Sequence, residues 1–185
     1  MRQRLLIAAV AAVAAAGGFV VQRWQAQRAA ADQAAPTTES IIGQSLPDFQ
    51  FPALTGGTLS RADIKNQPVL INLWATWCAP CREEMPALEA LHQRHAADGF
   101  QVLGVALDEA GRVAEFLKDT PVTYPILLTE TLPGITFARS LGNRSGVLPY
   151  SIWVGADGKV ASVTLGEMQA DTLNAQAAEL LAEAK

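Results

Sequence analysis

The sequence predicts an α/β domain in which helices cover both faces of a mixed central sheet, preceded by an N-terminal hydrophobic helix. Two short and nearly all-apolar runs, residues 69–74 and 100–107, are typical of buried parallel strands. Segments with apolar residues near helical spacing separate such runs, and this alternation favours a sheet with helices on its faces. The pair Asp157-Gly158 lies between two further apolar runs and predicts a β-hairpin, so the sheet also has antiparallel strands.

Each expected element has its own signal in the chain. Residues 48–54 alternate between polar and apolar side chains as a strand does, and a glycine-rich turn follows them. Met85, Leu88 and Leu91 recur near helical spacing after the first buried strand. The expected order is a strand over 48–54, a short helix from 60–63, a strand over 69–74, a helix to residue 97, a strand over 100–107, a helix around 113–117 that Pro121 ends, a strand over 124–128, a short helix over 135–141, hairpin strands over 147–154 and 160–165, and a closing helix over 168–184.

The N-terminus predicts a location outside the cytoplasm. Arg2 and Arg4 precede an unbroken apolar run, residues 5–21. The run is longer than the core of a typical signal peptide and slightly shorter than a full membrane span. Residues 1–22 are therefore a membrane anchor or a cleaved signal sequence, and the length favours the anchor. Trp24 extends the segment with an aromatic side chain of the kind that lies at membrane interfaces.

Composition separates a tether from the domain. Residues 23–40 are rich in Ala and Gln and have no apolar periodicity, which predicts a flexible tether. The domain is then residues 41–185. The chain has a net charge of −4, and the domain has no basic stretch, so nucleic acid is not expected as a partner.

The chain has two cysteines, Cys78 and Cys81, in one Cys-x-x-Cys motif between an expected strand and an expected helix. The loop that they would close is too short to stabilise the fold much, so their role is expected to be chemical. Burial as inert core cysteines would explain neither their spacing nor their position, and two thiolates are only half of a tetrahedral zinc site. His92 and His95 are three apart on the expected helix, and we expect a solvated face rather than a metal half-site because no further ligand is evident. The spacing and the junction are typical of dithiol redox chemistry.

The motif and its surroundings resemble the thioredoxin superfamily and, more narrowly, its membrane-tethered TlpA/ResA-like thiol-disulfide reductases. The resemblance covers residues 41–185. It rests on LWATWCAPCREEMP at residues 73–86, on Val147-Leu148-Pro149 and on the Asp-Gly hairpin. It implies a thioredoxin-like fold in three layers, with an inserted strand and helix between the active-site helix and the proline.

The two cysteines are expected to have different roles. Cys78 would lie at the helix N-terminus, where unpaired N–H groups and the helix dipole stabilise a thiolate, so we assign it as the attacking nucleophile. Cys81, one turn further, would be the resolving thiol. Pro80 suits the first helical turn, where its missing N–H has no cost. No histidine lies between the cysteines to hold the thiolate, which favours a reductant over a strong oxidant.

Glu84 lies three residues after Cys81 and therefore shares a helix face with it. Plain thioredoxins have a buried Asp on the strand before the motif, and Asn72 stands at the matching position here. The resemblance implies that Glu84 tunes the pKa values of the cysteines and relays a proton to Cys81. The alternative is a solvated helix carboxylate like Glu83.

Three further residues complete the expected site. Pro149 matches the cis-proline that faces the disulfide in this superfamily and offers backbone for a substrate strand. Trp74 and Trp77 are expected to form an apolar platform around Cys78, although Trp74 could equally be part of the core.

The resemblance also implies a setting and partners. The protein would act on the periplasmic side of the bacterial inner membrane, anchored by its N-terminal helix or released if that segment is cleaved. It would reduce a disulfide-containing substrate protein, such as apocytochrome c or a copper-site assembly protein, and receive electrons from a membrane dithiol donor of the DsbD/CcdA type. No cofactor beyond the Cys78–Cys81 disulfide is expected, and no metal.

Other functions stay open from the sequence. A disulfide oxidase or isomerase would use the same motif. A thiol peroxidase would need a Thr three residues before its reactive cysteine, where Ala75 stands. A copper-delivery module of a related kind would pair a wider Cys-x-x-x-Cys with a distant His, and the spacing here is shorter.

Overall fold

The computed structural model describes residues 17–28, 35–64 and 66–184, in two units, Met1–Ala35 and Pro36–Lys185. In the first unit, residues 17–28 are helical. Most of the expected hydrophobic segment over residues 1–22 lies outside the described residues. Within the described ranges, no helix is both long enough and apolar enough to cross a membrane.

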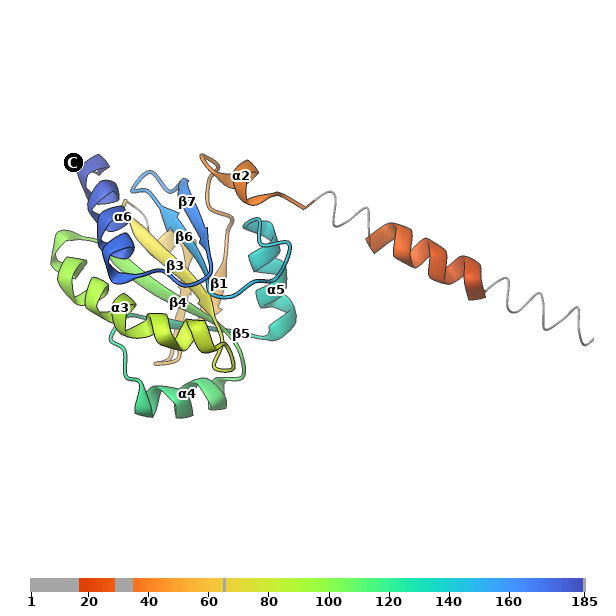
Figure 1. The fold of residues 1–185 in the computed structure, drawn as a ribbon, viewed down its shortest axis with the longest axis horizontal. Coiled ribbons are helices and arrows are strands. Elements are labelled where there is room, and N and C mark those ends of the chain that lie inside the picture. Colours follow the sequence, from red (N-terminus) through yellow and green to blue (C-terminus); the bar gives the residue numbers. More distant parts are fainter. Residues whose placement is uncertain (1–16, 29–34, 65, 185) are drawn as a thin grey trace, which may run out of the picture. The chain divides into compact units, whose positions relative to one another are not determined.

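The second unit is built on a five-stranded sheet with the strand order β5-β4-β3-β6-β7 (Figure 1). The strands β3, β4 and β5 run parallel, and β6 and β7 join them antiparallel, so the sheet is mixed as the sequence predicts. The five strands are β3 (Val69–Trp74), β4 (Gln101–Leu107), β5 (Ile126–Thr129), β6 (Tyr150–Val154) and β7 (Val160–Leu165).

Helices cover both faces of this sheet (Figure 1). One buried cluster joins side chains of α3, α4 and α6 to one face, and a second joins α5 and the segment around β1 to the other. The helices are α2 (Thr38–Ile41), α3 (Ala79–His95), α4 (Ala110–Asp119), α5 (Thr131–Ser140) and α6 (Ala170–Glu183), with short 3-10 turns at Arg61–Ile64 and Ala96–Asp98. The predicted three-layer α/β fold is therefore present in the second unit.

Strand β3 contributes side chains to the hydrophobic clusters on both faces of the sheet. All six of its residues are buried. Leu70 and Trp74 belong to the cluster under α3, whereas Ile71 and Leu73 belong to the cluster under α5, as the period of two in a strand requires. Asn72 lies on the α3 face between Leu70 and Trp74, and it places a buried polar side chain there.

Two expected boundaries differ in the structure. The compact unit begins at Pro36 rather than at residue 41, because Thr37 caps α2 and the Thr38 hydroxyl donates to the Gly142 carbonyl. The strand expected over 147–154 begins only at Tyr150. The backbone of Val147 is paired instead with the side chain of Asn143, which accepts from its N–H and donates to its carbonyl.

The first expected strand is also shorter. Strand β1 (Gln50–Pro52) pairs antiparallel with β2 (Thr58–Ser60), which the sequence analysis assigned to a turn and the start of a helix. The part of the expected tether that is described is helical up to residue 28, and residues 29–34 of it lie outside the described residues.

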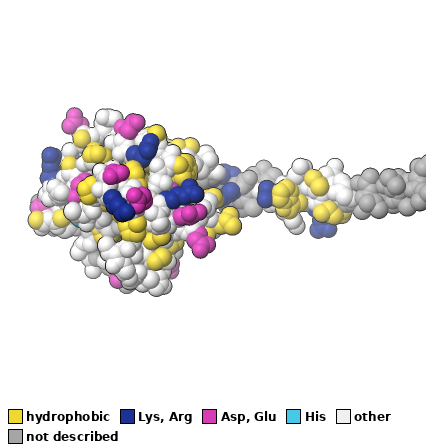
Figure 2. Space-filling model, turned by 90° about the horizontal axis from the view of Figure 1, so that it is seen from below, with side chains coloured by type: hydrophobic (Ala, Val, Ile, Leu, Met, Phe, Trp, Pro, Cys, Tyr) yellow, Lys and Arg dark blue, Asp and Glu magenta, His cyan; other side chains and the backbone are white. Residues whose placement is uncertain are grey.

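Figure 2 views the molecule from the α4 side and shows Lys and Arg side chains mixed with Asp and Glu on that face, with no continuous basic surface there.

Gly134 allows α5 to lie close to the sheet. A Cβ atom at this position would be 2.8 Å from Leu107 Cγ on β4 and 2.8 Å from Thr129 Cγ2 on β5. Real Cβ atoms do not approach carbon atoms so closely, so either α5 or the side chains of Leu107 and Thr129 would have to shift. Gly111 on α4 is the matched case, since a Cβ there would have nothing within 4 Å.

We predict opposite effects of the same substitution at these two helical glycines. Gly134→Ala should lower the free energy of unfolding by about 1–3 kcal/mol, because overpacking outweighs the better helix propensity of alanine. Gly111→Ala should leave the free energy of unfolding unchanged or raise it by up to about 1 kcal/mol. Urea unfolding of both variants checks this, and equal stabilities would contradict the close approach of α5.

Candidate active site

The two cysteines form a disulfide at the N-terminus of α3. The Cys78–Cys81 bond has an S–S length of 2.03 Å and a Cα–Cα distance of 5.3 Å. Cys78 is the N-cap residue of α3, and its Sγ accepts a hydrogen bond from the Cys81 N–H at 3.3 Å. The first N–H groups of a helix have no intrahelical partner, so this position favours a sulfur that carries negative charge once the bond is reduced. Both cysteines are buried, Cys81 more completely than Cys78.

The local sequence explains why the helix begins here. Strand β3 ends at Trp74, and the Cys78 N–H donates to the Ala75 carbonyl at 3.1 Å, which closes a turn between strand and helix. Pro80 lies in the first turn of α3, where a missing N–H leaves no hydrogen bond unmade. The motif is therefore a rigid connection between a buried strand and a helix.

Glu84 is buried under this motif, with only 1% of its surface exposed, so the alternative of a solvated carboxylate does not hold. Its Oε1 accepts from the Met168 N–H at 3.2 Å, and its Oε2 accepts from Asn72 Nδ2 at 3.3 Å. Asn72 Nδ2 also donates to Ser151 Oγ at 2.9 Å. Three elements thus meet at one carboxyl group in an otherwise apolar layer.

The pKa of Glu84 is raised to about 7, and burial of the carboxyl group is the main cause. Hydrogen bonds from Met168 and Asn72 oppose this rise, while the negative charge of Glu167 adds to it. Near neutral pH, Glu84 can therefore both hold and release a proton, one helical turn from Cys81.

The two tryptophans lie in different environments. Trp74 is 1% exposed and belongs to the same buried cluster as both cysteines, with its ring 5.7 Å from that of Phe116. Trp77 is 66% exposed. The structure places Trp74 in the core and leaves Trp77 as the aromatic side chain that a partner can reach beside the disulfide.

Pro149 is buried directly before β6, and the Leu148–Pro149 peptide bond is cis, as the resemblance implies. Leu148 and Trp77 line one cavity of about 290 Å³, together with Ile135 and Arg139 of α5. The loop of residues 75–78, called the active-site loop below, and the loop that ends at Pro149 therefore line the same cavity.

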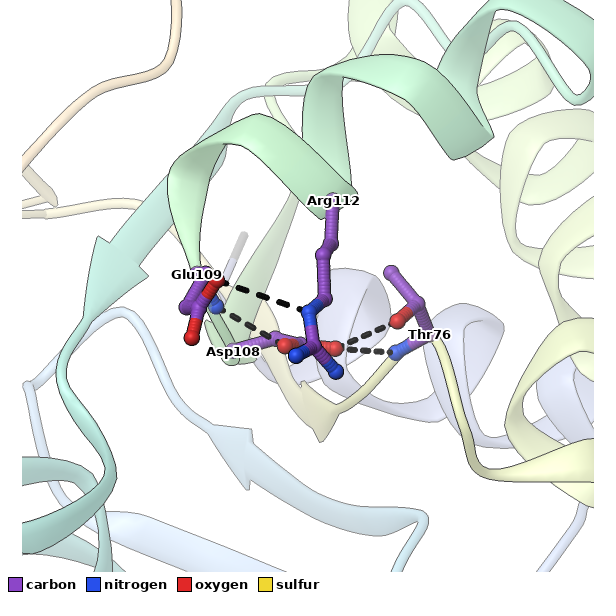
Figure 3. Close-up of polar contacts among 4 residues, drawn as sticks. All are labelled: Thr76, Asp108, Glu109 and Arg112. Atoms are coloured by element: carbon purple, nitrogen blue, oxygen red, sulfur yellow. Dashed lines mark hydrogen bonds and ion pairs between the residues drawn. The ribbon is translucent and has the colours of Figure 1, made fainter.

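Asp108 and Thr76 also belong to this region, and the sequence analysis missed both. Asp108 Oδ2 accepts from the Thr76 N–H at 3.1 Å and from the Thr76 hydroxyl, and its Oδ1 accepts from the Glu109 N–H at 2.8 Å (Figure 3). A signal was present in the sequence: Asp108 is the first polar residue after a buried strand, and the carboxyl ends of parallel strands meet at one edge of a sheet.

The two histidines of α3 do not lie on a solvated face, contrary to expectation. His92 packs edge-on against Tyr124, and His95 contacts both the Asp98 carboxylate and the ring of Phe100. Both are partly buried because α3 lies close to the neighbouring segments along this side. Within the described part of the chain, no group of three His, Cys, Asp or Glu side chains is arranged to hold a metal ion.

Proteins with related sequences have names that describe thiol-disulfide chemistry or a thioredoxin-like protein. The Redoxin family profile matches residues 41–181. The chain is 30% identical over 134 residues to a thiol-disulfide oxidoreductase ResA of Bacillus cereus, covering 71% of this chain and 74% of the relative. It is 43% identical over 90 residues to the thioredoxin-like protein YneN of Bacillus subtilis, covering 46% of this chain and 52% of that protein.

Solved structures of proteins named for thiol-disulfide chemistry superpose on this chain. A protein from Chlorobium tepidum assigned as thiol:disulfide interchange protein DsbE superposes with a TM-score of 0.68 at 30% identity, covering 76% of this chain and 97% of that one. A secreted thiol-disulfide isomerase from Corynebacterium glutamicum superposes with a TM-score of 0.67 at 29% identity, covering 74% and 85%. Since the family profile spans most of the chain and the Cys78–Cys81 pair lies at the helix N-terminus, the chain belongs to the Redoxin family and is a thiol-disulfide oxidoreductase.

Proposed function

We propose that this oxidoreductase works as a disulfide reductase outside the cytoplasm. The observation that carries the proposal is the dithiol itself, whose first cysteine caps α3 and whose second lies one turn from the buried Glu84. Ala79 and Pro80 separate the cysteines, so no cationic side chain of the motif holds the Cys78 thiolate. Strong disulfide oxidants stabilise their reduced, thiolate form unusually well. The Cys78–Cys81 pair has no cationic side chain between its cysteines to stabilise the thiolate in this way.

The reaction follows from the positions of the three groups. The Cys78 thiolate attacks one sulfur of the substrate disulfide, and the other substrate sulfur leaves as a thiolate that takes up a proton. Cys81 then loses its proton to the Glu84 carboxylate, and its thiolate attacks Cys78 Sγ. The bond between Cys78 and the substrate breaks, the second substrate sulfur leaves as a thiolate that takes up a proton from water, and Glu84 returns its proton to water. The enzyme ends with the Cys78–Cys81 disulfide, and the substrate ends with two thiols.

The N-terminal apolar run and the secreted relative from Corynebacterium glutamicum support a location on the periplasmic side of the membrane. In an oxidising compartment the enzyme must be reduced again after each turnover. A membrane dithiol donor of the DsbD/CcdA type would supply those electrons. Apocytochrome c and copper-site assembly proteins are the substrates that we propose, since both need reduced cysteines before they bind haem or metal.

The reduction potential of the Cys78–Cys81 couple tests this direction of electron flow. Equilibration of the purified chain with defined thiol buffers should give a value at or below about −220 mV, towards the thioredoxin end of the scale. A value near about −120 mV would mark an oxidant and would contradict the reductase proposal.

Glu84→Gln should slow the resolving step, because glutamine cannot take the proton from Cys81. The measurement starts from Cys78 joined to an aromatic thiol as a mixed disulfide and follows release of that thiol by absorbance. Release should be slower by about tenfold to a hundredfold. This factor lies at or below the lower end of the rate enhancement that a positioned proton acceptor typically contributes. The wild-type rate should rise with pH through about 7, and the variant should lack that rise. Glu83→Gln, a change at the exposed neighbour, should behave as wild type; if both variants keep the wild-type profile, Glu84 relays no proton.

Glu84 should also make stability depend on pH. Its pKa is about 7 in the folded chain against an ordinary value of 4.5 for a glutamate, so the folded state holds the proton more tightly than the unfolded state. The free energy of unfolding should therefore fall as pH rises from about 4.5 to about 7, by about 3 kcal/mol from this group. Urea unfolding of the oxidised protein across this range should show a smaller fall in Glu84→Gln than in Glu83→Gln. Parallel curves for the two variants would contradict the raised pKa.

A further inference from the structure

The loop that carries Cys78 is tied to a second loop by a single carboxylate (Figure 3). Strands β3 and β4 are parallel, with Trp74 opposite Ala106 at their carboxyl ends. Two residues beyond that pair, the chains have left the sheet at Thr76 and Asp108. The strand register therefore places Asp108 beside Thr76. The Asp108 side chain joins the two chain segments just beyond the last backbone hydrogen bonds between β3 and β4.

The contacts of Asp108 divide between two elements. One carboxylate oxygen accepts both polar hydrogens of Thr76, from its N–H and its hydroxyl. The other oxygen accepts from the Glu109 N–H at the start of α4. Charge-assisted hydrogen bonds of this kind are roughly twice as strong as neutral ones. One side chain thus joins Thr76 in the loop before Cys78 to Glu109, the N-cap residue of α4.

We propose that Asp108 is a positioning residue for thiol-disulfide exchange: by holding Thr76, it keeps Cys78 at the N-cap of α3 and keeps Trp77 at the surface beside it. Trp74 and Ala75 are already anchored in the core before Thr76, and α3 anchors the chain after Cys78. Between these anchors, the contact with Asp108 restrains the loop from the outside. The role applies to exchange in either direction, so it does not depend on whether the enzyme is a reductase.

The ionisation of the Asp108 carboxyl group favours a lasting contact with Thr76. Burial alone would raise its pKa, but the hydrogen bonds from Thr76 and from the Glu109 N–H, together with the positive charge of Arg112, outweigh that effect and lower the pKa of Asp108 below its usual value. The carboxylate therefore stays ionised, and the contact stays formed, over the range in which thiols react. The neighbouring Glu109 instead pairs with Arg112 at 3.4 Å on the surface of α4.

Positioning and simple charge effects predict opposite outcomes. A carboxylate near a thiolate disfavours the thiolate, so removing only its charge would make Cys78 more reactive. If Asp108 instead holds the loop, its loss lets Cys78 drift from the helix N-terminus, and the thiolate loses stabilisation. The direction of the change therefore separates the two effects.

The test compares four variants of the full chain with wild type. Thr76→Val removes the hydroxyl contact and keeps the charge of Asp108, whereas Thr76→Ser keeps both. Asp108→Ala removes the carboxylate, and Glu109→Gln is the matched control that breaks only the neighbouring ion pair. The readout is the rate at which iodoacetamide alkylates the reduced protein as a function of pH, since this rate follows the Cys78 thiolate. Thermal unfolding of each oxidised variant confirms that the chain is folded.

We expect Thr76→Val and Asp108→Ala to react roughly fivefold more slowly below the pKa of the thiol, the factor that corresponds to the loss of about one net hydrogen bond. Their profiles should move to higher pH, while Thr76→Ser and Glu109→Gln follow wild type. The charged groups around the loop, Arg82, Glu83 and Glu84 on α3 and Arg112 on α4, are the same in all variants, so differences between profiles report the contact itself.

Two outcomes would overturn the proposal. One is a wild-type profile for folded Thr76→Val and folded Asp108→Ala. The other is faster alkylation of Asp108→Ala with no change in Thr76→Val, which would mean that Asp108 acts only through its charge. If Asp108→Ala does not fold, the comparison of Thr76→Val with Thr76→Ser decides by itself. Valine has nearly the shape of threonine but lacks the hydroxyl, whereas serine lacks the methyl group but keeps the hydroxyl.

Discussion

The redox site depends on the junction at which the buried strand β3 becomes the helix α3. The strand is buried on both faces, so its end cannot shift without disturbing both hydrophobic clusters. Cys78 is the residue at which helical hydrogen bonding begins, and its sulfur accepts an N–H of the first turn. The Cys78 sulfur therefore lies at a helix terminus that the core holds in place.

A network of buried hydrogen bonds in the otherwise apolar layer under α3 also constrains the packing around the site. Asn72, Glu84 and Ser151 come from β3, α3 and β6, and the Met168 N–H precedes α6. Buried polar groups are costly unless they are paired. Here Asn72 and the Met168 N–H pair with the Glu84 carboxyl group, and Asn72 extends the network to Ser151. The same burial that requires these partners raises the pKa of Glu84 to about 7, so structural and chemical roles have a common origin.

The surface beside the disulfide is assembled from loops at one edge of the sheet. Trp77 comes from the loop after β3, Asp108 from the loop after β4, and Leu148 from the loop before β6. Asn143 holds the last of these loops through two hydrogen bonds to Val147. A substrate that reaches Cys78 would thus meet side chains positioned by several independent contacts. Preorganisation of this kind limits the entropy lost when the reacting sulfurs come into line.

The layered α/β fold, the buried strands and the pair of cysteines at a strand-to-helix junction could all be predicted from the amino-acid sequence. These features depend on local periodicity and spacing, which a single chain displays directly. The sequence also placed Glu84 on the face of Cys81, but it left open whether that carboxyl group is solvated. Tertiary structure alone decided the burial of Glu84, the separation of Trp74 from Trp77 and the pairing of Thr76 with Asp108. Each of these depends on which distant segment lies opposite a side chain, and the register between β3 and β4 and the packing of α3 against α6 become fixed only when the whole sheet forms.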